Sequence, residues 1–151
     1  MKKKPKKQLK FGLIGQNISY SFSEKYFTEK FEMGHYDNCE YANYDLNNIQ
    51  NLSKLIHQTK GLVGLNITIP YKEAIIPHLD KLSKTAQIIG AVNCVTVSKK
   101  KKLKGYNTDY YGFKKSLKQK SCFRHYMTKT TKMSEKHTIN SDLQKFSSPF
   151  G

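Results

Sequence analysis

The sequence predicts an α/β fold, with a twisted, largely parallel sheet, flanking helices and a hairpin on its C-terminal side. Three observations indicate this class. Short apolar runs rich in β-branched residues alternate with segments whose apolar residues recur at helical spacing. Glycine or proline stands near the ends of several of these segments, where a strand or helix is expected to stop. Two short runs near residue 100 are separated by a charged turn, as in a hairpin.

Five segments are predicted to be strands. The runs are residues 11–15, 39–46, 62–69, 91–98 and 103–106. Pro70 is expected to stop the third strand, because proline cannot donate to the hydrogen-bond ladder. The lysine-rich turn at 99–102 joins the last two strands.

Helices are predicted between these strands. A helix through Tyr26, Phe27 and Phe31 is expected to be capped by Ser21 or Ser23 and to end at Gly34. The others are expected at residues 48–60, closed by Gly61, at 72–82 with an interruption near Pro77, at 83–89 before Gly90, and at 110–117.

Charge divides the 151 residues into an expected core and two basic ends. The formal net charge is +16, of which residues 1–10 carry +6 and residues 118–151 carry +5. We therefore expect a basic, disordered N-terminus at 1–10, one domain at 11–117, and an atypical basic tail at 118–151 with little stable structure. Basic ends can bind nucleic acid or anionic membranes non-specifically, so no specific nucleic acid is expected as a partner.

Cysteine content and hydropathy favour a cytoplasmic protein with reduced thiols. The three cysteines, Cys39, Cys94 and Cys122, show no metal-ligand spacing, so no metal site is expected. No apolar stretch approaches the roughly 18 residues needed to span a membrane.

Two polar segments at strand ends point to an enzyme. Asn66-Ile67-Thr68-Ile69-Pro70-Tyr71-Lys72 holds an amide, a hydroxyl and an amine, and Gly105-Tyr106-Asn107-Thr108-Asp109 adds a carboxylate. Ligands of α/β sheets bind at loops beyond strand ends, so these segments are expected to share one cleft. There Lys72 and Asp109 can form a proton-transfer pair.

Five motifs between Gly12 and Leu117 resemble the N-terminal, substrate-binding domain of shikimate dehydrogenase, an aminoacid-dehydrogenase-like N-terminal domain. They occur in the family's order and at its spacing: Gly12-Leu13-Ile14-Gly15, Ser21-Phe22-Ser23, Gly64-Leu65-Asn66-Ile67-Thr68-Ile69-Pro70-Tyr71-Lys72-Glu73, Gly90-Ala91-Val92-Asn93 and Gly105-Tyr106-Asn107-Thr108-Asp109. One such motif alone is weak evidence, whereas five in order are specific.

The resemblance implies a reaction and a role for each matching residue. The family reduces 3-dehydroshikimate reversibly to shikimate with NADP, in aromatic amino acid (chorismate) biosynthesis. By this resemblance Lys72 and Asp109 form the catalytic pair. The residues that would bind substrate are Ser21 and Ser23, on its carboxylate, and Asn66, Thr68, Asn93 and Asp109, on its hydroxyl groups.

The sequence departs from the family's pattern near the site and after it. Tyr20, Glu24 and Cys94 replace the usual His, Pro and Thr. Beyond Leu117 no GxGxxG motif follows, and Gly12 and Gly15 lack the third glycine of a dinucleotide fingerprint. We therefore expect no complete Rossmann domain, no NADP-binding residues in this chain, a truncated or frame-shifted polypeptide, and no turnover without a cofactor domain.

Each of these residues, taken singly, also has a purely structural interpretation. Ser21, Ser23 and Asp109 could be helix caps, and Lys72 a solvated first-turn residue. For the whole chain the alternatives are a non-catalytic shikimate-binding remnant, a quinate/shikimate dehydrogenase, a basic nucleic-acid-binding module, and a Ser/Lys hydrolase, which lacks a GxSxG elbow. A homodimer is left open.

Overall fold

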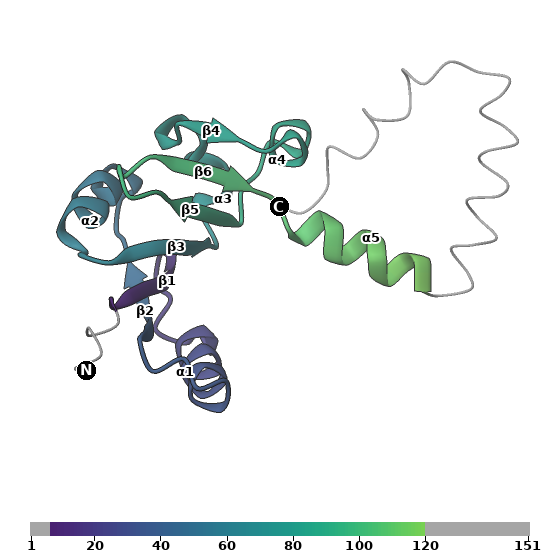
Figure 1. Ribbon diagram of the computed structural model, residues 1–151. Helices are drawn as coiled ribbons and strands as arrows, with labels where there is room; N and C mark the ends of the chain where they lie inside the picture. The colour runs from purple at the N-terminus through teal and green to yellow at the C-terminus, as the bar shows by residue number, and fades with distance from the viewer. Residues whose placement is uncertain (1–6, 120–151) are drawn as a thin grey trace, which may run out of the picture. The chain divides into compact units, whose positions relative to one another are not determined.

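The structure is a computed structural model that describes residues 7–119 (Figure 1). Its strands are β1 (Leu9–Gly15), β2 (Cys39–Asp45), β3 (Leu62–Ile67), β4 (Lys81–Leu82), β5 (Cys94–Val97) and β6 (Leu103–Tyr106). Its α-helices are α1 (Ser23–Met33), α2 (Leu52–Gln58), α3 (Tyr71–Ala74), α4 (Lys84–Ile89) and α5 (Asp109–Gln119). Two short 3-10 helices are η1 (Ile49–Asn51) and η2 (Ile76–His78).

The six strands form one sheet in the order β2-β1-β3-β5-β6-β4. Parallel pairs join β1 to β2, β1 to β3, and β4 to β6, whereas β5 is antiparallel to both β3 and β6. The prediction of a largely parallel α/β sheet with a hairpin is confirmed, and the hairpin is β5–β6. Because β5 is antiparallel to its neighbours, its first residue lies at the same end of the sheet as the last residues of β3 and β6.

Helices cover the two faces of the sheet unequally. The larger core lies between one face and the elements α2, α3 and α4, and it includes the fully buried Ile14, Leu52, Ile75 and Val95. On the other face, which we call the α1 face, Leu13 and Tyr41 pack with Phe27 and Phe31 of α1. Figure 1 shows α1 beside β1 and β2, at one end of the sheet.

Several predicted boundaries are wrong in instructive ways. The helix expected at 72–82 ends early, and Lys81–Leu82 instead forms β4, which pairs with Lys104 and Gly105 of β6. The helix expected at 48–60 divides into η1 and α2. β1 begins at Leu9, and β5 is shorter than the predicted strand at 91–98. The tail prediction concerns residues that, from 120 onward, lie outside the described part, as do residues 1–6.

The start of α1 differs from its predicted serine cap. Phe22 occupies the N-cap position and makes no side-chain cap, while the Ser21 hydroxyl accepts a hydrogen bond from the Ser23 N–H at 3.2 Å. The carboxylate of Glu24 accepts from the backbone N–H of Asn43 at 3.3 Å. Since β2 is an edge strand, this bond ties the first turn of α1 to the free edge of the sheet. The predicted end at Gly34 is confirmed.

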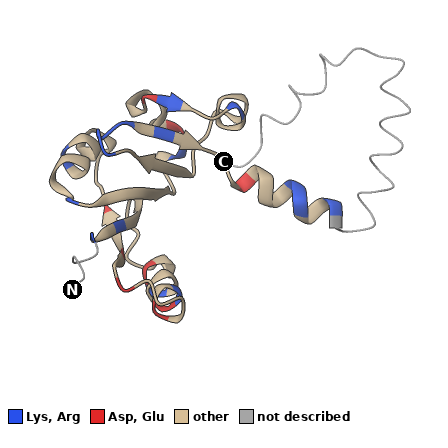
Figure 2. Cartoon of the chain, in the orientation of Figure 1, with Lys and Arg blue, Asp and Glu red and all other residues tan. Residues whose placement is uncertain are grey.

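Part of the basic charge serves the fold. Figure 2 shows basic residues on β4, β6 and α5. In the turn between β5 and β6, Lys101 donates to the carbonyls of Ile56 and Thr59 at the end of α2, at 2.8 and 3.2 Å. Lys102 pairs with Asp80 at 2.7 Å. The turn lysines therefore fasten the hairpin to its neighbours.

The chain divides into two units after Tyr110, and the boundary falls within α5. The sheet and all predicted site residues belong to the first unit, and α5 continues into the second. Within residues 7–119 no helix has the length and apolar character required to cross a membrane.

Replacing Ile75 by alanine is expected to lower the free energy of unfolding by about 2–5 kcal/mol, because the side chain is fully buried and leaves a cavity. Ile88→Ala is the matched control. Its side chain is 81% exposed, so the change should stay within about 0.5 kcal/mol. Urea unfolding of both variants measures the difference, and equal losses would contradict the placement of the core.

Candidate active site

The predicted site residues lie at one end of the strands of the sheet, and this end is called the site edge below. Gly15 ends β1, Ile67 ends β3 and Tyr106 ends β6, while β5 starts there with Cys94. The Ile67 N–H donates to the Asn93 carbonyl at 2.9 Å, which joins the end of β3 to the start of β5. The sequence predicted that the polar segments lie beyond strand ends, and the structure places the ends of these strands together.

The loop after β3 is held from both sides. Thr68 donates its N–H to the Ile14 carbonyl at 2.8 Å, and the Lys72 carbonyl accepts from the Val92 N–H at 2.7 Å. The buried Tyr71 donates its hydroxyl to the carbonyl of Leu46. Backbone bonds therefore fix the segment from which the Thr68 and Lys72 side chains project.

Lys72 and Asp109 form the predicted pair. The Lys72 ammonium lies 2.6 Å from Asp109 Oδ2, and the Asn93 carboxamide donates to Asp109 Oδ1 at 2.6 Å. Each oxygen of the carboxylate therefore has its own donor. The side chains of Lys72 and Asp109 are 39% and 56% exposed, so a ligand can reach both.

Asn93 is the one buried polar residue of the described core, at 8% exposure. Its Oδ1 accepts from the Thr108 N–H at 2.8 Å, and its Nδ2 also donates to the Thr108 hydroxyl at 2.8 Å. Asn107 caps α5 by accepting from the Tyr110 N–H at 3.0 Å. The segment Asn107-Thr108-Asp109 therefore combines a cap, a clamp on Asn93 and a carboxylate, of which only the carboxylate was predicted from the sequence.

Asn66, another predicted residue, contacts Tyr41 of β2. The Tyr41 hydroxyl donates to Asn66 Oδ1 at 2.9 Å. Burial raises the pKa of Tyr41 to about 12, although the Ser23 side chain acts in the opposite direction. Tyr41 was not predicted as a site residue, because a lone tyrosine in a strand gives no functional signal.

Asp45 is another residue that the sequence did not identify. Its two carboxylate oxygens accept the backbone N–H groups of Asn17 and Ile18 at 2.9 and 3.2 Å. Ile18 is buried, and its carbonyl accepts from the Ser21 N–H at 2.9 Å. Asp45, at the end of β2, thereby shapes the loop that presents Ser21.

Gly12 and Gly15 are required by packing. A Cβ atom at Gly12 would lie 2.3 Å from the Tyr44 ring, and one at Gly15 would lie 2.4 Å from Ile18 and 2.6 Å from Thr68. Neighbouring side chains therefore fill the space beside both glycines. This is the opposite of a glycine-rich loop that leaves room for a pyrophosphate.

Cys94 lies next to the site on the α1 face. It is half-buried, and burial raises the pKa of its thiol. A cavity of about 170 Å³ beside it has a mostly apolar lining. The lining residues are Phe11, Phe27, Phe31, Tyr41, Gly64, Leu65, Asn66 and Cys94.

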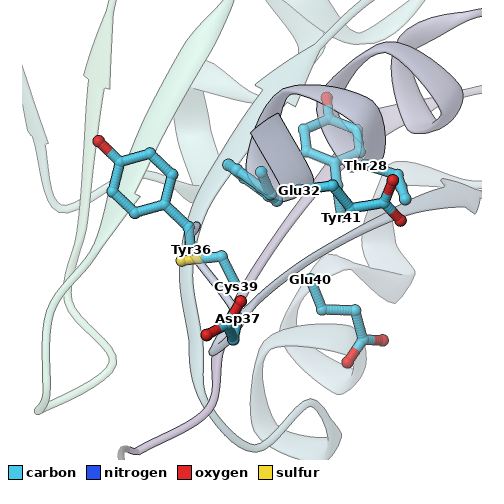
Figure 3. Close-up of a pocket in the computed structure, with 8 residues that line it drawn as sticks. Thr28, Glu32, Tyr36, Asp37, Cys39, Glu40 and Tyr41 are labelled. Carbon is cyan, nitrogen blue, oxygen red and sulfur yellow. The ribbon is translucent and has the colours of Figure 1, made fainter. Parts of the chain in front are cut away.

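A further cavity, of about 220 Å³, lies between α1 and the start of β2 (Figure 3). It is lined by Thr28, Phe31, Glu32, Tyr36, Asp37, Cys39, Glu40 and Tyr41. Tyr41 borders both cavities and is the one site residue that this cavity includes. Among residues 7–119 no group of three or more His, Cys, Asp or Glu side chains is arranged to hold a metal ion.

The arrangement suits a polar, anionic ligand. Ser21, Ser23, Asn66 and Thr68 offer neutral donors and acceptors, and Lys72 adds one cation. Hydroxyl groups donate to a carboxylate without adding charge. A lysine beside an oxygen that develops negative charge stabilises it and can supply a proton. These groups can therefore hold a polar, anionic ligand by hydrogen bonds and transfer a proton at one oxygen.

Asp109→Asn is expected to change the free energy of unfolding by less than about 1 kcal/mol, because an exposed ion pair contributes little. Asn93→Ala should cost more, about 1–3 kcal/mol, because Asn93 is buried and the change removes its hydrogen bonds to Thr108. Urea unfolding compares the two. A loss as large for Asp109→Asn as for Asn93→Ala would contradict this division of roles.

Stability is expected to fall as the pH rises from about 10 to about 12, by about 2–3 kcal/mol for Tyr41 alone. Tyrosine in the unfolded chain ionises near pH 10, whereas folded Tyr41 retains its proton to about 12. The contribution is complete below pH 10 and is lost through this window. Burial also raises the pKa of Tyr44 and Tyr71, which act in the same direction. Titration of ¹³C-labelled tyrosines by NMR tests it, and ionisation of Tyr41 near pH 10 would refute it.

Comparisons with known proteins agree with this geometry. The sequence profile of the shikimate dehydrogenase substrate binding domain matches residues 13–95. A protein of Staphylococcus epidermidis named shikimate dehydrogenase (NADP(+)) is 42% identical over 112 residues, which cover 74% of this chain and 41% of that protein.

Solved structures give the same result. A shikimate dehydrogenase from Peptoclostridium difficile superposes with a TM-score of 0.64 at 37% identity, over 74% of this chain and 41% of the other. A quinate dehydrogenase from Corynebacterium glutamicum, in complex with NAD, superposes with a TM-score of 0.64 at 30% identity, over 76% and 42%. This chain spans about two fifths of the length of the relatives it matches. It belongs to the family of shikimate dehydrogenase substrate-binding domains.

Proposed function

We propose that this chain supplies the substrate-binding and proton-transfer residues of an NADP-dependent shikimate dehydrogenase, which reversibly reduces 3-dehydroshikimate to shikimate in aromatic amino acid biosynthesis. One observation carries the proposal. Lys72, Asp109 and Asn93, from three separate segments, form one hydrogen-bonded cluster at the sheet edge where the family's substrate residues are expected.

The proposed ligand contacts follow the chemistry of each group. Ser21 and Ser23, near the start of α1, donate to the substrate carboxylate. Asn66 and Thr68, at the end of β3, hold ring hydroxyl groups together with Asn93 and Asp109. Several neutral partners suit a ring that carries several hydroxyl groups.

Lys72 is the proposed proton-transfer residue. When the substrate carbonyl is reduced, its oxygen gains negative charge, and the Lys72 ammonium stabilises this oxygen and donates a proton to it. Asp109 holds the ammonium at 2.6 Å, and Asn93 fixes the other carboxylate oxygen, so the donor points in a defined direction. In the reverse direction the same amine accepts the proton.

Gly12 and Gly15 do not form a phosphate-binding loop for NADP. The spaces beside Gly12 and Gly15 are filled by Tyr44, Ile18 and Thr68, so no phosphate can approach the backbone there. NADP is proposed as the cofactor of the complete enzyme because relatives carry it in their names. We assign no step through it to this chain.

The remaining proposals concern domain limits, partners and location. The substrate-binding domain is proposed to extend over residues 11–117, with a small-molecule acid as its partner. A cytoplasmic location is proposed because relatives of this family are dehydrogenases of small metabolites and Cys39 and Cys94 are free thiols.

A second candidate substrate is quinate. The similarity to the Corynebacterium quinate dehydrogenase favours it. Parallel titrations with quinate and shikimate decide between them, because the preferred acid binds at lower concentration.

Titration of the 151-residue chain with shikimate, followed by amide NMR, tests the proposal. Shifts should cluster on Ser21, Ser23, Thr68, Lys72, Asn93 and Asp109. Lys72→Met should weaken binding about tenfold, because a hydrogen bond to a charged group is lost. When the 151-residue chain is assayed alone with NADP and shikimate, we expect no turnover.

Lys102→Met is the matched control, since Lys102 also pairs with an aspartate, Asp80, at 2.7 Å, away from the sheet edge that carries the site. Its affinity for shikimate should equal that of the unmodified chain. A folded spectrum without any response at millimolar shikimate and quinate would reject the proposed function.

A further inference from the structure

We propose that Tyr41 is a positioning residue of the substrate site, whose hydroxyl fixes the Asn66 carboxamide so that its amide N–H groups face the ligand. This inference rests on the proposed function for the identity of the ligand. It concerns a residue on the second strand, outside every motif that the sequence suggested for the site.

The hydroxyl of Tyr41 is placed with little freedom. Tyr41 is 5% exposed, and its ring stacks on Phe27 with centroids 4.4 Å apart and planes at 14°. From this position the hydroxyl reaches Asn66 Oδ1 at 2.9 Å. A ring held on one side by a helix and at its tip by a strand has one orientation available.

Tyr41 reaches a predicted ligand residue that lies two strands away in the sheet. The strand β2 lies at the sheet edge beside β1, and its Tyr41 reaches past β1 to Asn66 of β3 on the α1 face. The position of the Asn66 carboxamide therefore depends on one side chain of the edge strand.

The bond determines which groups Asn66 can recognise. A carboxamide has one oxygen that accepts and one nitrogen that donates. Because Tyr41 donates to Oδ1, the Nδ2 hydrogens remain for the ligand, and the ligand atom must be an acceptor such as a hydroxyl or carboxylate oxygen. Burial raises the pKa of Tyr41 to about 12, so it remains a donor at neutral pH.

The test compares Tyr41→Phe with Tyr44→Phe, in ¹⁵N-labelled chains. Tyr44 lies on the same strand and its side chain packs with the core on the opposite face, so the control removes one hydroxyl from β2 without touching the site. We expect Tyr41→Phe to shift the Asn66 side-chain amide resonances and to weaken shikimate binding about 3- to 10-fold. Tyr44→Phe should do neither.

A double-mutant cycle makes the result specific to the pair. In an Asn66→Ala background, Tyr41→Phe should have no further effect on affinity. An equal effect in both backgrounds, or unchanged Asn66 side-chain resonances in Tyr41→Phe, would overturn the proposal.

Two measurements keep the question separate from folding and from substrate identity. If Tyr41→Phe does not fold, a nuclear Overhauser effect between the Tyr41 ring and the Asn66 side-chain amide in the unmodified chain supports the contact, and its absence overturns it. If the unmodified chain binds no shikimate, the proposed function fails, whereas the Asn66 resonances of Tyr41→Phe still decide the positioning role.

Discussion

The reversed direction of β5 is the constraint on which the site depends. In a sheet with only parallel strands, the residue before β5 would lie at the opposite edge from the ends of β1 and β3. Because β5 is antiparallel to β3 and β6, Asn93, which precedes β5, lies at the same end of the sheet as Tyr106, the last residue of β6. Asn93 can then bond Thr108 and Asp109, which follow β6 directly.

The two carboxylate oxygens of Asp109 have different surroundings. One oxygen faces the exposed Lys72, and the other faces the buried Asn93. The exposed pair adds little to folding, so its geometry is free to change when a ligand binds. The buried amide supplies the rigid part, because its own partners are backbone and side chain of Thr108. The Lys72–Asp109 pair is thus held in place through the buried Asn93.

The parts of the fold that follow from local chemistry could be predicted from the sequence. The apolar run at Leu62–Ile67 with Pro70 after it, and the helix between Ser83 and Gly90, need no distant partner to be recognised. β4 could not be predicted, because its two residues become a strand only by pairing with β6.

The same distinction holds for the site. Lys72 and Asp109 stand in polar motifs after strands, and the structure brings them together as expected. Tyr41 and Asp45 gave no signal, because their importance comes from what lies across the sheet or across a loop. Spacing along the chain therefore reveals polar motifs after strands more readily than the residues that hold these motifs in place.

The bond between Glu24 and the Asn43 N–H has a consequence for self-association. Exposed edge strands recruit other strands, and natural sheets guard them with charge, brevity or proline. β4 is guarded by being two residues long, with Lys81 in it. β2 has seven residues, and at its middle Glu24 occupies a donor that an incoming strand would need. Glu24 therefore blocks one of the backbone donors through which a second strand could pair with β2.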